Sequence, residues 1–200
     1  MNLANKITVL RLALTVFIII LLAFPFYEVG ITFPKYNVGG VIVEVQYIIA
    51  GVIFIIASLT DFIDGYIARS KNMITDLGKM LDAIADKVLV DSSLILLACL
   101  GFIHMIIPVI IISRDIVVDA IKMQCAAKGF VVAAILEGKI KTACLMSGVA
   151  LTYFYNLPFE LINIRISIIL LYFACIMAIV SAIKYYNMYK KLSEKKNKEN

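Results

Sequence analysis

The chain consists of long apolar stretches separated by short polar segments. Each stretch has about the 20 residues that an α-helix needs to cross a bilayer. The stretches run over 8–27, 47–69, 79–101, 105–127, 139–156 and 163–186. Between the first two lies EVGITFPKYNVGGVIVEVQ, which is rich in glycine and turn residues and is expected to be a loop. The pattern predicts an all-α integral membrane protein, a bundle of six transmembrane helices.

Composition supports a membrane location and a single domain. Hydrophobic residues make up 62% of the chain and charged residues only 16%, which is outside the range of soluble domains. A length of 200 residues suggests one domain, which we place over 1–190, followed by a charged cytoplasmic tail over 191–200. The four cysteines lack CxxC or metal-ligand spacing and are expected to be packing thiols.

The placement of lysine and arginine predicts the orientation of the chain. The side that holds both termini would carry Lys6, Arg11, the cations of the 69–79 and 122–141 segments and the lysine-rich tail. The opposite side would carry only Lys35 and Arg165. Because cytoplasmic loops are enriched in cations, both termini are expected in the cytoplasm. The net charge of +5 then reflects topology, and a nucleic-acid partner is not expected.

Four aspartates lie where the second and third apolar stretches adjoin, in DFIDGYIARSKNMITDLGKMLDAIAD, residues 61–86. Asp61 and Asp64 are three residues apart, and Asp82 and Asp86 are four apart, so each pair shares one helix face. The short connection makes the two helices antiparallel neighbours, and their carboxylates can converge. Four such charges in a partly desolvated place require protonation or cations between them.

Two explanations of the aspartates compete. Ion pairs with Arg69, Lys79 or Lys87 would lock helices together, and they would account for one or two of the four. Several carboxylates with no histidine among them instead suit hard divalent cations such as Mg²⁺, Mn²⁺ or Ca²⁺. Two such ions close together can activate a nucleophile and steady a phosphate. Gly65 would let a ligand approach the backbone closely.

The same stretch reads D-x2-D-G-x2-A-R-x8-G-x3-D-x3-D, which resembles the signature of the CDP-alcohol phosphatidyltransferases. Its fixed positions are Asp61, Asp64, Gly65, Ala68, Arg69, Gly78, Asp82 and Asp86. The resemblance implies that the chain takes a CDP-linked lipid, usually CDP-diacylglycerol, and passes its phosphatidyl group to an alcohol with release of CMP. It also implies the bundle of that family, with a polar cavity facing the cytoplasm, and a homodimer.

The resemblance further implies roles for individual residues. Two divalent cations, Mg²⁺ or Mn²⁺, would be bound by Asp61, Asp64, Asp82 and Asp86. Asp86 would also be the catalytic base that takes the proton of the acceptor hydroxyl. The site of the CDP-lipid would comprise Thr8, Gly65, Ala68, Arg69 and Gly78, together with Asp61, Asp64 and Asp82.

Other segments bear on the acceptor. NKITVLR, with Asn5, Thr8 and Arg11, resembles the opening of bacterial phosphatidylglycerophosphate synthases, and so do DAIADKVLV, IIISRDIVVDAIKM and GKIKT. This branch implies sn-glycerol 3-phosphate as acceptor and the cell membrane of a bacterium as location. Arg114, Lys139 and Lys141 are cations suited to the acceptor phosphate. Alternatively, both lysines are positive-inside anchors, and Arg114 pairs with Asp115 or Asp119.

Some positions depart from that branch, namely Ala83, Asp115, Asp119 and Lys122. The adjacent Arg114 and Asp115 resemble the CMP-forming cardiolipin synthases, whose acceptor is phosphatidylglycerol, and an acceptor of the phosphatidylinositol phosphate synthase type also stays open. A different class, a small cation transporter, is disfavoured because the carboxylates lie at one membrane face and nothing resembles an inverted repeat. A non-catalytic relative acting as a scaffold is disfavoured because every signature position is intact.

Overall fold

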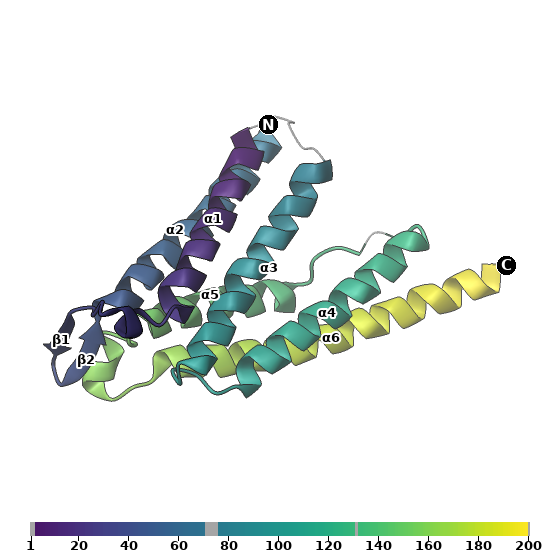
Figure 1. Ribbon diagram of the computed structural model, residues 1–200. Coiled ribbons are helices and arrows are strands. Elements are labelled where there is room, and N and C mark those ends of the chain that lie inside the picture. The colour runs from purple at the N-terminus through teal and green to yellow at the C-terminus, as the bar shows by residue number, and fades with distance from the viewer. Residues whose placement is uncertain (1–2, 71–75, 131, 200) are drawn as a thin grey trace.

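The computed structural model describes residues 3–70, 76–130 and 132–199, with side chains over 5–60, 78, 80–130 and 132–194 (Figure 1). In chain order the elements are α1 (Leu3–Ala23), η1 (Phe26–Val29), β1 (Lys35–Val38), β2 (Val41–Glu44), α2 (Val45–Ser70), α3 (Asp76–Cys99), α4 (Ile106–Ala127), α5 (Leu136–Tyr153), η2 (Phe159–Ile162) and α6 (Ile166–Glu199). The α-helices of the described ranges follow the six expected apolar stretches, because a long apolar run is most stable with its backbone hydrogen bonds inside a helix.

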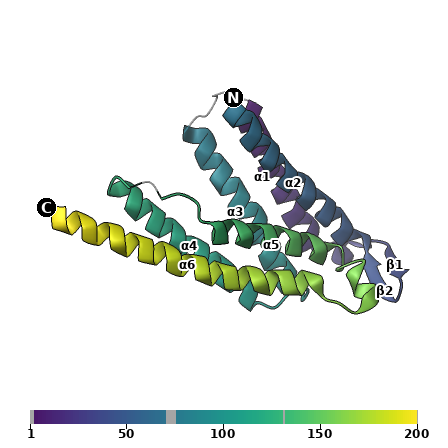
Figure 2. The same cartoon turned by 180° about the vertical axis from the view of Figure 1, so that it is seen from behind.

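The helices form two groups, which meet where α5 packs against α2 and α3 and where α4 packs against α3. Helix α1 packs against α2 and α3, while α6 packs against α4 and α5 (Figures 1 and 2). The core between them is apolar and includes Ile18, Phe54, Leu89, Leu97, Ile111, Leu145, Tyr153 and Leu171. Gly51 of α2 permits a close approach to α5, since a Cβ there would lie 2.8 Å from Cβ of Tyr153.

The outer surface of the helices is also apolar, as the predicted membrane location requires. Phe17, Ile20 and Ile176 are each more than half exposed, and together with many similar residues they leave apolar faces uncovered. Within the described residues, two helical segments are long and apolar enough to cross a membrane, Asn5–Ala23 and Ile166–Glu194, and a shorter apolar one covers Val45–Thr60. Six crossings therefore stay a prediction, while a mostly helical fold is confirmed.

The segment expected to be a loop contains a β-hairpin. Strands β1 and β2 pair antiparallel, with Lys35 opposite Glu44 and Val38 opposite Val41. Gly39 and Gly40 form the two-residue turn with φ of +60° and +93°, which is the conformation that such hairpins need. Tyr155 anchors the hairpin, because its hydroxyl accepts a hydrogen bond of 3.0 Å from the backbone N–H of Glu44. The strands are only four residues each, too short for a clear alternating pattern.

The connections place the polar residues at two opposite ends of the bundle. The hairpin, the α3–α4 turn and the α5–α6 connection lie together at one end (Figure 1). The N-terminus, the last turns of α2 and the first turns of α3 lie at the other end. Helix α6 continues without a break through residue 191, where the predicted domain gives way to the charged tail. The aspartate end is therefore separated from the hairpin end by the length of the helices.

Candidate active site

Arg11 of α1 joins two of the signature aspartates. Its Nη1 donates hydrogen bonds of 3.0 Å to Oδ1 of Asp82 and 3.0 Å to Oδ1 of Asp86, both on α3. The Arg11 side chain is fully buried, while those of Asp82 and Asp86 are 43% and 45% exposed. A buried guanidinium is stable only with such partners. The two carboxylates thus converge, as their spacing of four residues predicted, with their remaining surface open.

Arg11 is a site residue that the sequence pattern did not identify. By sequence, Arg11 is a cation that indicates topology. It belongs to NKITVLR, a segment that resembles the opening of the family branch. The signal that could have found it is its position inside an apolar stretch, where an ionisable residue needs a partner. Thr8 lies one turn earlier on the same face of α1 and is buried. Helix α1 therefore presents both side chains toward the beginning of α3.

Most of the other residues predicted to bind the metals or the CDP-lipid lie in α2, where the structure describes the backbone but not their side chains. The backbone of α2 carries Asp61, Asp64, Gly65, Ala68 and Arg69, but their side chains lie outside the described residues. Gly78 is partly buried near the start of α3. Among the side chains that are described, no group of three or more carboxylate, cysteine or histidine residues could hold a metal ion. The four-aspartate metal site thus stays a prediction, of which the described part is the pair Asp82 and Asp86.

The donor chemistry of this pair fits a hard divalent cation. Both groups offer carboxylate oxygens, half exposed and on one helix face, which is what Mg²⁺ or Mn²⁺ binds. The competing explanation was an ion pair with Arg69, Lys79 or Lys87. The side chains of Arg69 and Lys79 lie outside the described residues, and the ammonium of Lys87 forms an ion pair with Asp119 of α4. Asp119 was one of two predicted partners of Arg114, and the structure uses it to tie α3 to α4 instead.

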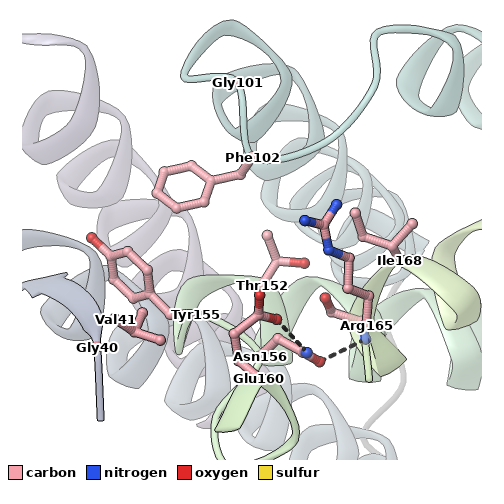
Figure 3. Close-up of a pocket in the computed structure, with 11 residues that line it drawn as sticks. Gly40, Val41, Gly101, Phe102, Thr152, Tyr155, Asn156, Glu160, Arg165 and Ile168 are labelled. Atoms are coloured by element: carbon pink, nitrogen blue, oxygen red, sulfur yellow. Dashed lines mark hydrogen bonds between the residues drawn. The ribbon is translucent and has the colours of Figure 1, made fainter. Parts of the chain in front are cut away.

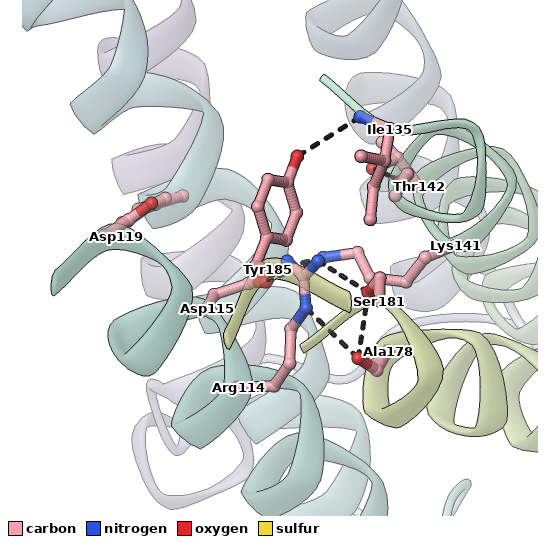
Figure 4. Close-up of polar contacts among 11 residues, drawn as sticks. Arg114, Asp115, Asp119, Ile135, Lys141, Thr142, Ala178, Ser181 and Tyr185 are labelled. Atoms are coloured by element: carbon pink, nitrogen blue, oxygen red, sulfur yellow. Dashed lines mark hydrogen bonds and ion pairs between the residues drawn. The ribbon is translucent and has the colours of Figure 1, made fainter. Parts of the chain in front are cut away.

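A second polar cluster links α4, α5 and α6 (Figure 4). Arg114 donates from Nη1 to Oδ1 of Asp115 at 2.7 Å, from Nη2 to Oγ of Ser181 at 2.6 Å and from Nε to the carbonyl of Ala178 at 3.3 Å. Lys141 of α5 donates to both oxygens of Asp115, at 3.0 and 2.9 Å. Two buried cations thus share one acid, and the cluster keeps a net positive charge.

A basic pocket with a volume of about 700 Å³ opens beside this cluster. It is lined by Arg114, Lys122, Ala134, Ile135, Gly138, Lys139, Thr142, Ala143 and Tyr185. Three of these residues are cations and none is an acid. The buried ring of Tyr185 forms its floor, with Nζ of Lys122 at 5.2 Å and Cζ of Arg114 at 5.9 Å from the ring centroid. Such a pocket suits a small anion.

Hydrogen bonds fix the walls of the basic pocket. The Tyr185 hydroxyl accepts a hydrogen bond of 3.2 Å from the backbone N–H of Ile135, just before α5 (Figure 4). Gly138 lies beside Arg114, since a Cβ at Gly138 would be in ordinary contact with Nη2 of Arg114 at 3.8 Å. Thr142 donates to the carbonyl of Gly138 at 3.1 Å. The GKIKT segment therefore shapes the pocket through Gly138 and Thr142 as well as through its lysines.

Of the three cations predicted to bind the acceptor phosphate, two line the basic pocket and one does not. Arg114 and Lys139 line the basic pocket, and Lys139 is exposed. Lys141 is buried with its ammonium on Asp115, and it is absent from the lining of the basic pocket. Lys122, noted only as a departure from the family branch, lines the pocket. Asp91, partly buried on α3, interacts electrostatically with Asp115 and Lys141, which connects this cluster with the helix that carries Asp82 and Asp86.

Comparison with known proteins identifies the family of the chain. Residues 1–180 match the model of the CDP-alcohol phosphatidyltransferase family, so the chain belongs to that family. The predicted family and the predicted enzyme class, a transferase of phospholipid biosynthesis, are thereby confirmed. Membership also supports the coarser prediction of a membrane protein.

Two relatives of this family cover nearly the whole chain. A CDP-diacylglycerol–glycerol-3-phosphate 3-phosphatidyltransferase of Bacillus subtilis is 39% identical over 93% of this chain and 94% of its own length. A protein of the same name from Haemophilus influenzae is 36% identical over 88% of this chain and 91% of its own length. The chain is therefore similar along most of its length to bacterial proteins that carry that name.

Proposed function

We propose that the protein transfers the phosphatidyl group of CDP-diacylglycerol to sn-glycerol 3-phosphate, giving phosphatidylglycerophosphate and CMP. The observation that carries the proposal is the basic pocket, whose lining includes Arg114, Lys122 and Lys139 and no acid. A phosphate-bearing acceptor needs clustered cations, whereas a neutral alcohol needs hydrogen-bonding groups instead. The names of the relatives from B. subtilis and H. influenzae support the same acceptor.

The acceptor phosphate would lie between the three cations of the basic pocket. Arg114 presents a planar guanidinium that is already fixed by Ser181 and by the carbonyl of Ala178, so little side-chain entropy is lost on binding. Lys122 and Lys139 are exposed and can adjust to the phosphate oxygens. Lys141 adds positive charge from behind, and through Asp115 it holds Arg114 in place.

The chemistry would take place at the aspartates. Asp61, Asp64, Asp82 and Asp86 would hold two divalent cations, which when bound neutralise the charge of the diphosphate. Asp86 takes the proton of the acceptor hydroxyl, whose oxygen then attacks the phosphorus of the phosphatidyl group. The bond from that phosphorus to the oxygen of CMP breaks, and CMP leaves. Arg11 keeps Asp86 beside Asp82, and Thr8, Gly65, Ala68, Arg69 and Gly78 would line the CDP-lipid site.

CMP release by the purified protein tests the acceptor. With CDP-diacylglycerol and Mg²⁺ or Mn²⁺, we expect release with sn-glycerol 3-phosphate and none with phosphatidylglycerol or inositol phosphate. Because a charge-assisted hydrogen bond contributes about 1.5–3 kcal/mol, Lys139→Ala should raise KM for glycerol 3-phosphate roughly tenfold or more with little change in kcat. Lys190→Ala is the matched control, since Lys190 is an exposed cation of α6 that does not line the basic pocket. Release with phosphatidylglycerol instead would assign the chain to the cardiolipin synthase type.

Substitution of the aspartates tests the mechanism separately from the acceptor. Asp61→Ala and Asp86→Asn should each abolish CMP release while the protein still accumulates in the membrane, because one loses a metal ligand and the other the base. Removal of divalent cations with a chelator should abolish release as well, and Mg²⁺ or Mn²⁺ should restore it. Glu28→Gln, an exposed acid at the hairpin end, serves as control. Activity retained by both aspartate variants would contradict the proposed roles, and ion flux without any CDP-lipid would revive a transporter.

A homodimer completes the proposal. The family resemblance predicts it, and the apolar outer faces of the helices offer surface for a second copy. Sedimentation of the protein in detergent, with the detergent contribution matched by density, distinguishes a dimer from a monomer.

A further inference from the structure

A second polar pocket lies at the hairpin end of the bundle, far from the aspartates (Figure 3). Its volume is about 470 Å³. It is lined by Gly40 and Val41 of the hairpin, Gly101 and Phe102 of the α3–α4 turn, and Thr152, Tyr155, Asn156, Glu160, Arg165, Ser167 and Ile168 around the α5–α6 connection. We call it the hairpin pocket. It is built from three connections that are remote in sequence.

Two opposite charges line the hairpin pocket without forming an ion pair. Arg165 projects its guanidinium into the space near Thr152, Phe102 and Ile168 (Figure 3). Glu160 keeps its carboxylate in place by accepting a hydrogen bond of 2.9 Å at Oε2 from Nδ2 of Asn156. Within the described residues, Arg165 takes part in no ion pair. The pocket thus offers a cation and an anion held apart.

Asn156 is the fixed centre of this arrangement. It is buried, and its side chain also donates to the carbonyl of Ile164 at 2.7 Å and accepts from the N–H of Ser167 at 2.9 Å. Tyr155 and Asn156 both have left-handed backbone conformations, with φ of 56° and 57°. Each such residue costs about 1–2 kcal/mol, so the surrounding contacts must offset that cost. The walls of the hairpin pocket are therefore formed before any ligand arrives.

The surroundings of the hairpin pocket are those of a membrane–water interface. Tyr47, Phe102 and Tyr155 form an edge-to-face aromatic cluster beside it, with ring centroids 4.8 to 6.0 Å apart. The same three connections also carry exposed apolar side chains, namely those of Ile42, Met105, Leu161, Ile162 and Ile164. The α3 helix between Asp82 and Cys99 is roughly 25 Å long, close to the thickness of the hydrocarbon core. A lipid bound here would belong to the leaflet opposite to the aspartates.

We propose that the hairpin pocket binds the head group of a zwitterionic phospholipid, with the phosphate on Arg165 and the ammonium on Glu160. The planar guanidinium matches phosphate oxygens, and the N-terminus of α6, which begins at Ile166, adds its positive dipole end. The acyl chains leave over the exposed apolar side chains of the three connections. This site is separate from the proposed transfer reaction, so it is structural or regulatory.

Native mass spectrometry of the full-length protein in detergent tests this site. With phosphatidylethanolamine and phosphatidylglycerol added in turn, we expect the wild type to retain phosphatidylethanolamine at least tenfold better. Arg165→Ala should lose that retention, Arg165→Lys should keep part of it, and Glu160→Gln should bind both lipids equally. Lys35→Ala is the matched control, because Lys35 is a cation of the same end that pairs with Glu44 and does not line the hairpin pocket.

The outcomes separate this proposal from the transferase. In detergent without added phosphatidylethanolamine, CMP release and the thermal midpoint of Arg165→Ala should equal those of the wild type, which shows that the variant is folded. Equal retention of both lipids by the wild type, or unchanged retention by Arg165→Ala, would overturn the proposal. Displacement of the lipid by an equal concentration of phosphoethanolamine would assign the pocket to a soluble compound and overturn the lipid assignment.

Discussion

Arg11 illustrates how a single residue decides whether two carboxylates can work together. Its Nη1 contacts both Asp82 and Asp86, and its side chain is fully buried between α1 and α3. The guanidinium offsets the repulsion between the carboxylates and sets their direction. It touches the proposed base and a proposed metal ligand, and we expect it to act as a positioning residue.

Removal of Arg11 should therefore reduce the rate more than the affinity. We expect Arg11→Ala to lower kcat for CMP release about 100-fold, the loss that follows from a displaced catalytic group, and to lower the thermal midpoint because a buried cavity is left. Arg11→Lys should recover part of both. Lys6→Ala removes an exposed cation from the same helix and should change neither. A wild-type kcat in folded Arg11→Ala would show that Asp82 and Asp86 need no positioning by this residue.

The residue scale also shows what sequence reasoning can and cannot find. The spacing of Asp82 and Asp86 correctly predicted that both lie on one face of α3, because helix periodicity is a local property. The convergence with Asp61 and Asp64 stays a prediction. Arg11 was missed since its contacts reach across 71 and 75 positions of the chain, where no local pattern applies. Lys122 was noted as a departure, yet it lines the basic pocket over the ring of Tyr185. The role of Lys122 depends on its contact with Tyr185, which only the fold brings close to it.

At the scale of elements, the length of the apolar stretches predicted the helices, whereas no sequence pattern predicted the two short strands. Stretches of about 20 apolar residues identified the helices to within about five residues, because in a low-dielectric setting only a helix satisfies its own backbone. The exception is the end of α6, which continues to Glu199 although the apolar stretch ends at residue 186. The hairpin of β1 and β2 was missed because its stability comes from elsewhere. Tyr155 bonds Glu44, and Val43 is buried against the bundle. These contacts exist only after α5 has packed.

The start of α5 is tied to α6 by an ion pair that should respond to pH. A hydrogen bond from Lys184 holds the pKa of the Glu137 carboxyl below its ordinary value of 4.5. A lowered pKa in the folded state contributes stability above pH 4.5, and this contribution is lost as pH falls through the lowered value. The thermal midpoint of the wild type should therefore exceed that of Glu137→Gln at pH 7, and the two should converge in acid. A difference that persists at pH 2 would contradict this assignment.

At the scale of the whole molecule, the two ends of the bundle should face different compartments. Cations gather at the end that holds the aspartates, and this predicts that the termini lie in the cytoplasm. In a cysteine-free background, Glu194→Cys in the tail should react with a membrane-impermeant thiol reagent only after the cells are opened. Tyr36→Cys in the exposed hairpin should react in intact cells. The reverse pattern would invert the orientation, and it would place the hairpin pocket in the cytoplasm.

Helix α6 runs past every site except the aspartates. Its 34 residues form one helix about 51 Å long. Ser167 and Ile168 line the hairpin pocket near its beginning, Ser181 and the carbonyl of Ala178 hold Arg114 further on, and Ser193 accepts from Lys128 near its end. A continuous helix transmits a rotation of its first turn along its length. If a bound head group rotates the first turn of α6, the same rotation reaches Ser181. The hydrogen bonds that hold Arg114 would then depend on the lipid composition of the leaflet at the hairpin end.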